Sequence, residues 1–334
     1  MASHVGGGVT RPVVTVTRRL PAVVEQELAA AFDVRLNAAD IPMSPAALVE
    51  AFRDSDAVLC TVTDRIDAAV LGGARPDGSA RARLLANYGV GFNHIDLAAA
   101  RAAGIAVTNT PGVLTDATAD ITLTLMLMVA RRAGEGEREV RGGRWNGWRP
   151  THLVGRAVTG RTLGIVGMGR IGQAVAARAH RGFGMPILYH SRTPLTVAAA
   201  AELGASARPL DALLAESDFV SLHTPAAPET RHLIDRRRLA LMRPDAFLIN
   251  TARGDIVDEA ALIEAVEAGT IAGAGLDVYE REPAVPAALV ARENVVLLPH
   301  LGSATDEART AMGRRALANL VAWFRGEPPP DRLA

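Results

Sequence analysis

The chain has 334 residues, 49% of them hydrophobic, with 36 basic and 36 acidic side chains and thus no formal net charge. This length predicts two domains, and the balanced charge argues against a general surface for nucleic acid or anionic membrane, while a small anionic substrate needs only a local arginine patch. The single cysteine, Cys60, excludes an internal disulfide, and its apolar neighbours predict a buried strand thiol.

The sequence offers no stretch that is expected to enter a membrane. Residues 1–10 contain a glycine triplet but no apolar signal-peptide core. The most apolar run, residues 121–130, is too short for a bilayer and carries threonines. We therefore expect a soluble, cytoplasmic protein.

The first third of the chain alternates predicted strands with predicted helices. Strands are predicted at residues 12–17, 34–36, 57–62, 82–88 and 105–108, and helices at 23–32, from Pro45 onward, and at 66–71 and 95–103. This alternation predicts a parallel sheet built from βαβ units.

Residues 88–93 follow one of these strands at its carboxyl end, where ligands of such sheets bind. Gly89 and Gly91 leave backbone N–H groups exposed, which favours either an anion-binding concavity for a carboxylate or a simple tight turn. His94 and Asp96 are predicted to open the next helix.

One long helix is predicted over residues 118–141, apolar nearly all round at first and then charged. A helix that is apolar on all sides is buried, either in the core or against another subunit. The Trp-rich segment 145–150 that follows favours the subunit contact, and a symmetric dimer is its common form.

The next feature is a glycine fingerprint between a predicted strand and an Ala-rich helix. It consists of Gly167, Met168, Gly169, Arg170, Ile171 and Gly172. The first glycine permits a tight turn, the second lets the backbone approach a pyrophosphate, and the third lets helix and strand pack closely. The anion then meets free N–H groups at a helix N-terminus, so a dinucleotide site is predicted here rather than an ordinary turn.

The end of the following strand bears on which dinucleotide binds. About 20 residues past the last glycine, where an Asp or Glu would bind the ribose 2′-hydroxyl of NAD, the chain has Ser191, Arg192 and Thr193. Arg192 with the two hydroxyls could bind a 2′-phosphate, which favours NADPH over NADH. The alternative is that Arg192 is a solvated loop residue.

The second half of the chain continues the βαβ pattern. Strands are predicted at residues 219–222, 246–250, 273–278 and 295–298, and a last helix at 306–324, ended by Gly326 and Pro328. Polar side chains follow these strands in four segments, at residues 223–225, 250–254, 280–283 and 299–300.

Three of these side chains supply what the reduction of a 2-oxo acid needs. Arg253 can grip the substrate carboxylate with two parallel hydrogen bonds. A protonated His300 can stabilise the developing charge on the carbonyl oxygen and donate its proton, and Glu282 can keep that ring oriented and charged. Each has a structural alternative: an ion pair of Arg253 with Asp255 or Asp258, a surface Glu282, or a satisfied buried His300.

Four motifs together resemble the D-isomer-specific 2-hydroxyacid dehydrogenase family. They are Gly-Met-Gly-Arg-Ile-Gly at 167–172, Asn-Thr-Ala-Arg-Gly at 250–254, Gly-Leu-Asp-Val-Tyr-Glu-Arg-Glu-Pro at 275–283 and Leu-Pro-His at 298–300. The resemblance implies that Arg253, Glu282 and His300 are the catalytic residues and that Val90 and Gly91 belong to the loop that binds the substrate carboxylate. We expect no metal at the site.

The resemblance also implies a fold and a division of the chain. Two βαβ domains, each with a doubly wound parallel sheet, should flank a cleft, with the cofactor domain inserted into the substrate domain and hinges near Thr108 and His300. We expect a flavodoxin-like substrate domain at residues 1–107 and 301–334 and a Rossmann domain at 108–300. Its cofactor contacts beyond residues 167–172 and 191–193 should be His223, Thr224, Pro225, Thr251, Ala252, Arg253, Asp277, His300 and Gly302.

Within the family, the chain looks most like glyoxylate/hydroxypyruvate reductases, on the strength of residues 91–96, 145–150 and 191–193. In that branch a Trp from the neighbouring subunit closes the substrate pocket, and Trp148 is the candidate here, with Trp145 as the alternative. We expect NADPH-dependent reduction of glyoxylate and hydroxypyruvate by a homodimer. The alternatives are a bulkier 2-oxo acid, NAD-dependent oxidation of D-hydroxy acids, or a dinucleotide-sensing, corepressor-like protein.

Overall fold

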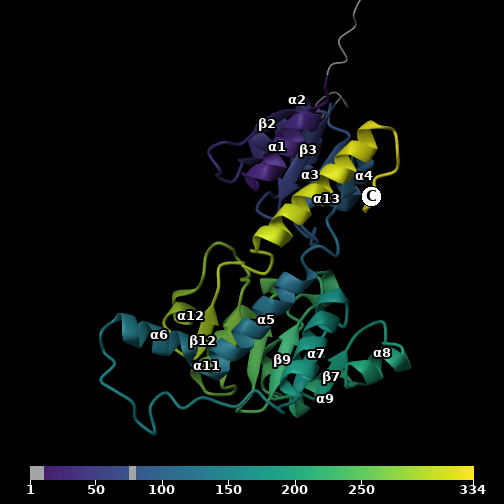
Figure 1. The fold of residues 1–334 in the computed structure, drawn as a ribbon. Coiled ribbons are helices and arrows are strands. Elements are labelled where there is room, and N and C mark those ends of the chain that lie inside the picture. Colours follow the sequence, from purple (N-terminus) through teal and green to yellow (C-terminus); the bar gives the residue numbers. More distant parts are fainter. Residues whose placement is uncertain (1–10, 75–79) are drawn as a thin grey trace, which may run out of the picture. The chain divides into compact units, whose positions relative to one another are not determined.

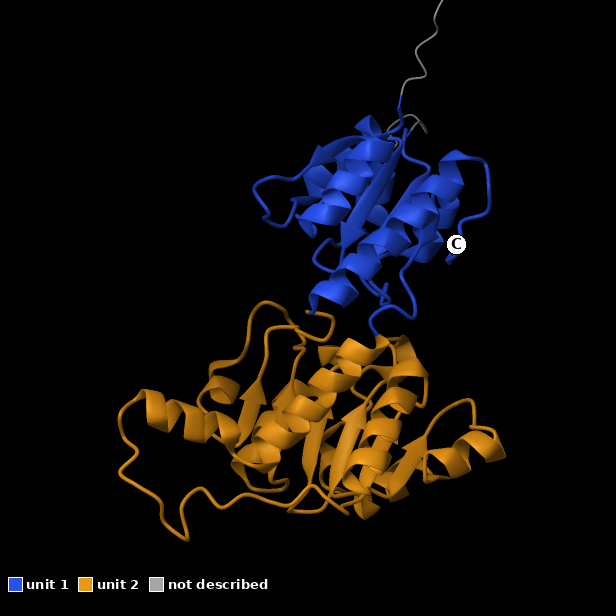
Figure 2. Ribbon diagram, viewed as in Figure 1, with its two compact units in different colours: residues 1–114, 305–334 blue, residues 115–304 orange. Residues whose placement is uncertain are grey.

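The computed structural model describes residues 11–74 and 80–334 of the chain. It forms two compact units: Met1–Leu114 with Thr305–Ala334, and Thr115–Ala304 (Figure 2). The second unit is thus inserted into the chain of the first. The expectation for residues 1–10 falls outside the described residues.

The first unit is a parallel sheet with helices on both faces (Figure 1). The strand order is β2-β1-β3-β4-β5, and every pairing is parallel. The strands are β1 (Val13–Val16), β2 (Asp33–Leu36), β3 (Ala57–Thr61), β4 (Leu84–Tyr88) and β5 (Ala106–Thr108). The helices are α1 (Ala22–Ala31), α2 (Pro45–Asp54), α3 (Ala68–Gly73), α4 (Leu97–Ala102) and α13 (Asp306–Phe324).

Two apolar layers cover this sheet. Leu28 of α1 and Leu320 of α13 pack on one face, and Phe52 of α2 and Leu71 of α3 pack on the other. Cys60 lies in β3 with no exposed surface, as predicted, and burial raises the pKa of its thiol well above the ordinary value. Asp96 accepts a hydrogen bond from the Ala99 N–H at the start of α4, which confirms its predicted place in helix entry.

The second unit holds a larger parallel sheet of order β12-β11-β10-β9-β6-β7-β8. Its strands are β6 (Leu163–Val166), β7 (Ile187–His190), β8 (Ala205–Ala207), β9 (Phe219–Leu222), β10 (Phe247–Asn250), β11 (Gly273–Leu276) and β12 (Val295–Leu297). The expected α/β class with two doubly wound parallel sheets is therefore confirmed.

Helices flank this sheet on both faces as well. One face is covered by α5 (Thr115–Ala130) and α7 (Arg170–Phe183), and the other by α9 (Leu210–Glu216), α10 (Arg236–Leu239), α11 (Glu259–Glu267) and α12 (Ala287–Val290). Completing the unit are α6 (Ala133–Arg141), α8 (Val197–Glu202) and the 3-10 turns η1 (Pro228–Thr230) and η2 (Gly254–Ile256).

The prediction of one helix over residues 118–141 is wrong. The chain forms two helices, α5 and α6, because Arg132 between them has a left-handed backbone with φ 53° and ψ 33°. A left-handed residue cannot continue the right-handed hydrogen-bond ladder. The Arg132 guanidinium contacts Glu135 at 3.0 and 2.6 Å. The break also separates two environments, since half of α5 is buried and α6 has no buried residue.

The first unit ends at Leu114 and resumes at Thr305. Both boundaries lie a few residues later in the chain than the expected ones, which follow residues 107 and 300. Val113 and Leu114 pack against the core beneath α13, which places them in the first unit. Leu301 and Gly302 donate N–H bonds to Asp277 of the second unit. Over the described residues, no helix is both long and apolar enough to cross a membrane.

Candidate active site

The glycine fingerprint lies in the turn between β6 and α7, and two of its glycines are in close contact with backbone. Gly167 has φ 99°, and a Cβ there would lie 2.6 Å from the carbonyl carbon of His223. A Cβ on Gly172 would lie 2.2 Å from the Gly167 carbonyl oxygen. Only glycine satisfies both positions, because any side chain would push helix, turn and strand apart.

The middle glycine has different surroundings. Nothing lies within 4 Å of a Cβ built on Gly169, which is exposed and forms the N-cap of α7 with no side-chain cap. The first N–H groups of a helix have no partner inside it, so open space at this end fits the pyrophosphate of a dinucleotide. Met168 is buried beneath the turn, and Arg170 and Ile171 begin the helix.

The candidate 2′-phosphate site adjoins this turn. β7 pairs with β6, and the Gly167 N–H donates to the His190 carbonyl at 2.8 Å, so Ser191 follows directly beside the fingerprint. Arg192 and Thr193 are exposed. Within the described residues the Arg192 guanidinium has no hydrogen bond or ion pair, so its charge is available to a ligand.

Residues 223–225 follow β9 on the other side of β6. The His223 N–H donates to the Val166 carbonyl at 2.7 Å, and its ring lies 2.8 Å from Ser221 Oγ. Burial lowers the pKa of His223 to about 3, so the ring is neutral at physiological pH. Thr224 and Pro225 continue from it along the carboxyl edge of the sheet. A neutral His223 fits a packing role at this edge of the sheet better than a proton-transfer role.

Arg253 stands in a turn after β10 that Asn250 holds in shape. Asn250 is buried, its Nδ2 donates to the Arg253 carbonyl at 2.8 Å, and its Oδ1 accepts from the Ala252 N–H at 3.0 Å. The Thr251 hydroxyl pairs with Thr122 of α5 at 3.0 Å. No separate role is predicted for Asn250 from the sequence, although an asparagine at the end of a buried strand is a signal for such a turn.

The electrostatic surroundings link Arg253 to Glu282. Burial lowers the pKa of the Arg253 guanidinium, opposed by the charges of Glu282 and Asp255. The group remains charged at neutral pH. A Cβ on Gly254 would lie 1.9 Å from the Tyr279 carbonyl carbon, so this turn packs directly on the backbone that leads to Glu282.

A hydrogen bond links His300 and Glu282. Nδ1 of His300 lies 2.7 Å from Oε2 of Glu282, and both side chains are about one third exposed, at 31% and 32%. Burial raises the pKa of Glu282, but hydrogen bonds from His300 and the Tyr279 N–H, with the charges of His300 and Arg253, bring it below the ordinary value. Glu282 is thus an anion at neutral pH, and it leaves Nε2 of His300 for another partner.

Asp277 fixes the loop that carries His300. The Asp277 carboxylate accepts from the Leu301 N–H at 2.6 Å and from the Gly302 N–H at 2.8 Å, and its carbonyl accepts from the His300 N–H at 3.0 Å. These bonds hold His300 at φ 56°. Burial raises the pKa of Asp277. With both oxygens used in this way, Asp277 supports the loop, and Gly302 is further tied to Thr118 of α5.

The structure therefore brings Arg253, Glu282 and His300 together at the carboxyl edge of the second unit's sheet, beside the fingerprint. Val90 and Gly91 lie in the first unit, in the loop after β4. Trp148 lies in the segment between α6 and β6, where no helix or strand forms among residues 142–162. Its side chain is 82% exposed and that of Trp145 is 55% exposed.

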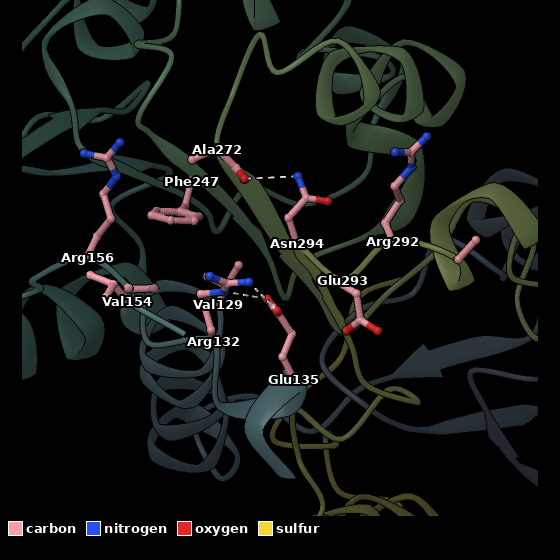
Figure 3. Close-up of a pocket in the computed structure, with 13 residues that line it drawn as sticks. Val129, Arg132, Glu135, Val154, Arg156, Phe247, Ala272, Arg292, Glu293 and Asn294 are labelled. Carbon is pink, nitrogen blue, oxygen red and sulfur yellow. Dashed lines mark hydrogen bonds and ion pairs between the residues drawn. The ribbon is translucent and has the colours of Figure 1, made fainter. Parts of the chain in front are cut away.

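A cavity of about 500 Å³ lies elsewhere in the second unit, between the α5–α6 junction and residues 154–156 (Figure 3). Phe247, Ala272 and Asn294 mark the amino ends of β10, β11 and β12, so the cavity is at the sheet edge opposite to His300. Its charged groups are paired, as Arg132 with Glu135 and Arg156 with Asp245. The cavity thus lies away from the candidate active site.

Fold and site together define a nicotinamide-dependent dehydrogenase, and comparison with known sequences narrows the class. The NAD-binding domain of D-isomer-specific 2-hydroxyacid dehydrogenases matches residues 123–302. The chain belongs to the D-isomer-specific 2-hydroxyacid dehydrogenase family. A glyoxylate reductase of Thermococcus litoralis is 46% identical over 96% of both chains. A glyoxylate reductase of Pyrococcus furiosus is 46% identical over 96% of this chain and 94% of its own.

Solved structures agree with this assignment. The TT0316 protein of Thermus thermophilus has a TM-score of 0.87 and 45% identity, covering 96% of this chain and 100% of its own. An NADPH-dependent glyoxylate/hydroxypyruvate reductase of Sinorhizobium meliloti, solved with NADP and malonate, has a TM-score of 0.85 and 35% identity. It covers 97% of both chains.

Proposed function

We propose that this protein is an NADPH-dependent reductase that converts glyoxylate to glycolate and hydroxypyruvate to D-glycerate. The hydrogen-bonded pair of His300 and Glu282, beside Arg253 and at the edge that carries the fingerprint, is the observation that carries the proposal. Relatives 46% identical over nearly the whole chain are named glyoxylate reductases, which supports a small 2-oxo acid as substrate.

A nicotinamide dinucleotide held at the glycine fingerprint would supply the hydride for the carbonyl carbon, and residues of the chain would bind the substrate, orient it and supply the proton. Arg253 grips the substrate carboxylate, helped by the backbone of Val90 and Gly91, and so fixes the carbonyl in place. His300 donates a hydrogen bond from Nε2 to the carbonyl oxygen as charge develops there, and then transfers its proton. Glu282 holds the ring by Nδ1 and stabilises its charged form.

The choice of NADPH rests on residues 191–193. Arg192 is exposed beside the fingerprint and no carboxylate stands among these three residues, so a 2′-phosphate would meet a cation and two hydroxyls without repulsion. The Sinorhizobium meliloti relative described as NADPH-dependent supports the same preference.

We further propose a homodimer formed through α5, α6 and residues 142–162. This part of the second unit exposes the large apolar residues Val140, Trp145, Trp148 and Val154, and exposed apolar surface favours a protein contact. In the dimer, Trp148 would close the partner's substrate pocket. Light scattering of the purified protein tests the dimer, and a monomer would contradict it. Cell fractionation tests the expected cytoplasmic location.

The deciding experiment follows the absorbance of reduced nicotinamide with glyoxylate and then hydroxypyruvate, using NADPH and NADH in parallel. Rapid loss with NADPH and slow loss with NADH is the expected result. Loss mainly with NADH would discard the role of Arg192 and keep the reaction. Preference for branched or aromatic 2-oxo acids would show that the substrate is a larger 2-oxo acid. Capture of partner proteins that depends on the dinucleotide, without reductase activity, would favour the corepressor-like alternative.

A further inference from the structure

The loop after β4 has three successive carbonyl groups that all accept hydrogen bonds from the first unit. The Gly89 carbonyl accepts from Asn87 Nδ2 at 3.0 Å and from the Thr110 N–H at 3.0 Å. The Val90 carbonyl accepts from Asn109 Nδ2 at 2.9 Å, and the Gly91 carbonyl accepts from Asn87 Nδ2 at 2.9 Å. Two asparagines thus hold every carbonyl of this short segment.

The Asn87 amide is itself fixed in orientation. Its side chain is fully buried, and its Oδ1 lies 3.1 Å from Nε2 of His94 and 3.8 Å from Sγ of Cys60. Burial keeps the Cys60 thiol protonated, because it raises the pKa of that thiol. With thiol and imidazole donors on the oxygen side, the two N–H groups of Asn87 face the loop carbonyls.

Because the peptide group is planar, the hydrogen bonds of the loop carbonyls also fix the direction in which the neighbouring N–H groups point. In a trans peptide the carbonyl of one residue and the N–H of the next point to opposite sides. Holding the carbonyls of Gly89 and Val90 toward Asn87 and Asn109 therefore turns the N–H groups of Val90 and Gly91 away from them. Across residues 11–74 and 80–334, neither N–H donates a hydrogen bond.

We propose that Asn87 and Asn109 are positioning residues that give the site its preference for a carboxylate, by holding the loop carbonyls away from the substrate and presenting the Val90 and Gly91 N–H groups to it. This inference rests on the proposed function. A carbonyl that turned toward the ligand would repel an anion and withdraw a donor at the same time, so the tethers affect a charged substrate far more than a neutral one.

The test compares glyoxylate with its uncharged amide, glyoxylamide, in two variants that remove one tether each. Asn109→Ala removes the donor to Val90, and Asn87→Ser leaves one hydroxyl where two N–H donors stood. For each variant we expect kcat/KM for glyoxylate to fall by about 10-fold, the scale of one hydrogen bond to a charged group, mainly through KM. The kcat/KM for glyoxylamide and the Kd for NADPH should change by less than about 3-fold.

Ser55→Ala is the matched control. Ser55 is fully buried in the same unit and its Oγ bonds Thr15 at 2.5 Å, away from the loop. It should lower the unfolding temperature without changing the ratio of the two substrates. Equal losses for glyoxylate and glyoxylamide in the asparagine variants would show a structural role and overturn the inference. Absence of glyoxylate reduction by the wild-type protein would instead overturn the proposed function, and the inference with it.

Discussion

Nδ1 of His300 lies 2.7 Å from Oε2 of Glu282, and this contact divides the two ring nitrogens between two tasks. Nδ1 is hydrogen-bonded to the carboxylate, so only Nε2 remains to contact a substrate. The backbone of His300 has φ 56°, and the Asp277 carboxylate accepts hydrogen bonds from the N–H groups of the next two residues. Together these features hold the ring in that orientation. The proposed proton donor is thus positioned by two acidic residues with different tasks.

Replacement of His300 by alanine should remove the proton donor. We expect kcat for glyoxylate to fall by about 10²- to 10⁴-fold, the usual contribution of general acid catalysis. The Kd for NADPH, measured by fluorescence titration, should stay the same. His232→Ala is a matched control, because His232 also pairs with a glutamate, Glu280, and is similarly exposed. Near wild-type turnover in His300→Ala would show that another group supplies the proton.

Glu282→Gln should narrow the pH range of reduction. The amide keeps much of the shape but not the negative charge that favours the protonated imidazole. The alkaline limb of kcat/KM should therefore move to lower pH, while the limiting rate at acid pH changes less. An unchanged pH profile would mean that Glu282 does not act through His300.

The lowered pKa of Glu282 also predicts an acid dependence of stability. The ordinary value is 4.5, and the folded protein holds this carboxylate ionised to lower pH than the unfolded chain does. Its stabilising contribution is therefore complete above about pH 4.5 and is lost as pH falls through the lower, folded pKa. The difference in thermal unfolding between wild type and Glu282→Gln should shrink over that acid range. A constant difference would contradict the shift.

Arg192→Ala should weaken NADPH use selectively. Loss of a charge-assisted hydrogen bond to the 2′-phosphate corresponds to about 10- to 100-fold in kcat/KM for NADPH. The same parameter for NADH should hardly change. Arg181→Ala provides the control, because Arg181 lies in the last turn of α7, at the other end of the helix from the fingerprint. Equal effects on both cofactors would remove Arg192 from the phosphate site.

Two glycine substitutions in the fingerprint should have different effects, one on the stability of the second unit and the other on cofactor binding. Gly172→Ala places a methyl group 2.2 Å from a backbone oxygen and should destabilise the second unit by at least about 1–3 kcal/mol, the cost of overpacking. Gly169→Ala meets open space at φ −76° and should fold normally, yet weaken NADPH binding by occupying the space of the pyrophosphate. Calorimetry and cofactor titration separate the two. Tight binding by Gly169→Ala would argue against the pyrophosphate position.

Regular patterns were sufficient to predict most elements of this fold. The last helix spans residues 306–324 as predicted, because apolar spacing and the residues that end it are both visible in the sequence. The break at Arg132 was missed, because an arginine in the left-handed region has no pattern of its own and depends on its contacts with Glu135. The candidate site residues could also be predicted, because polar side chains that follow strands of a parallel sheet lie at one edge of that sheet. Their catalytic roles stay predictions.

The tethers of the loop after β4 could not be predicted for a related reason. Asn87 is one buried polar residue in an apolar strand, and its partners Gly89 and Gly91 are close in sequence, so local chemistry alone allows a turn or an anion site. Asn109 reaches Val90 across 19 positions of the chain, and no periodicity encodes such a contact.

The insertion of one unit into the other has a consequence for the order in which the chain can fold during synthesis. The second unit is continuous, from Thr115 to Ala304, so all of its contacts are available once that stretch has left the ribosome. The first unit needs α13 to cover one face of its sheet, where Met312, Ala316 and Leu320 pack. Domains generally fold as units during translation. The inserted unit can therefore complete its core before α13 has been synthesised, while one face of the first unit's sheet is still uncovered.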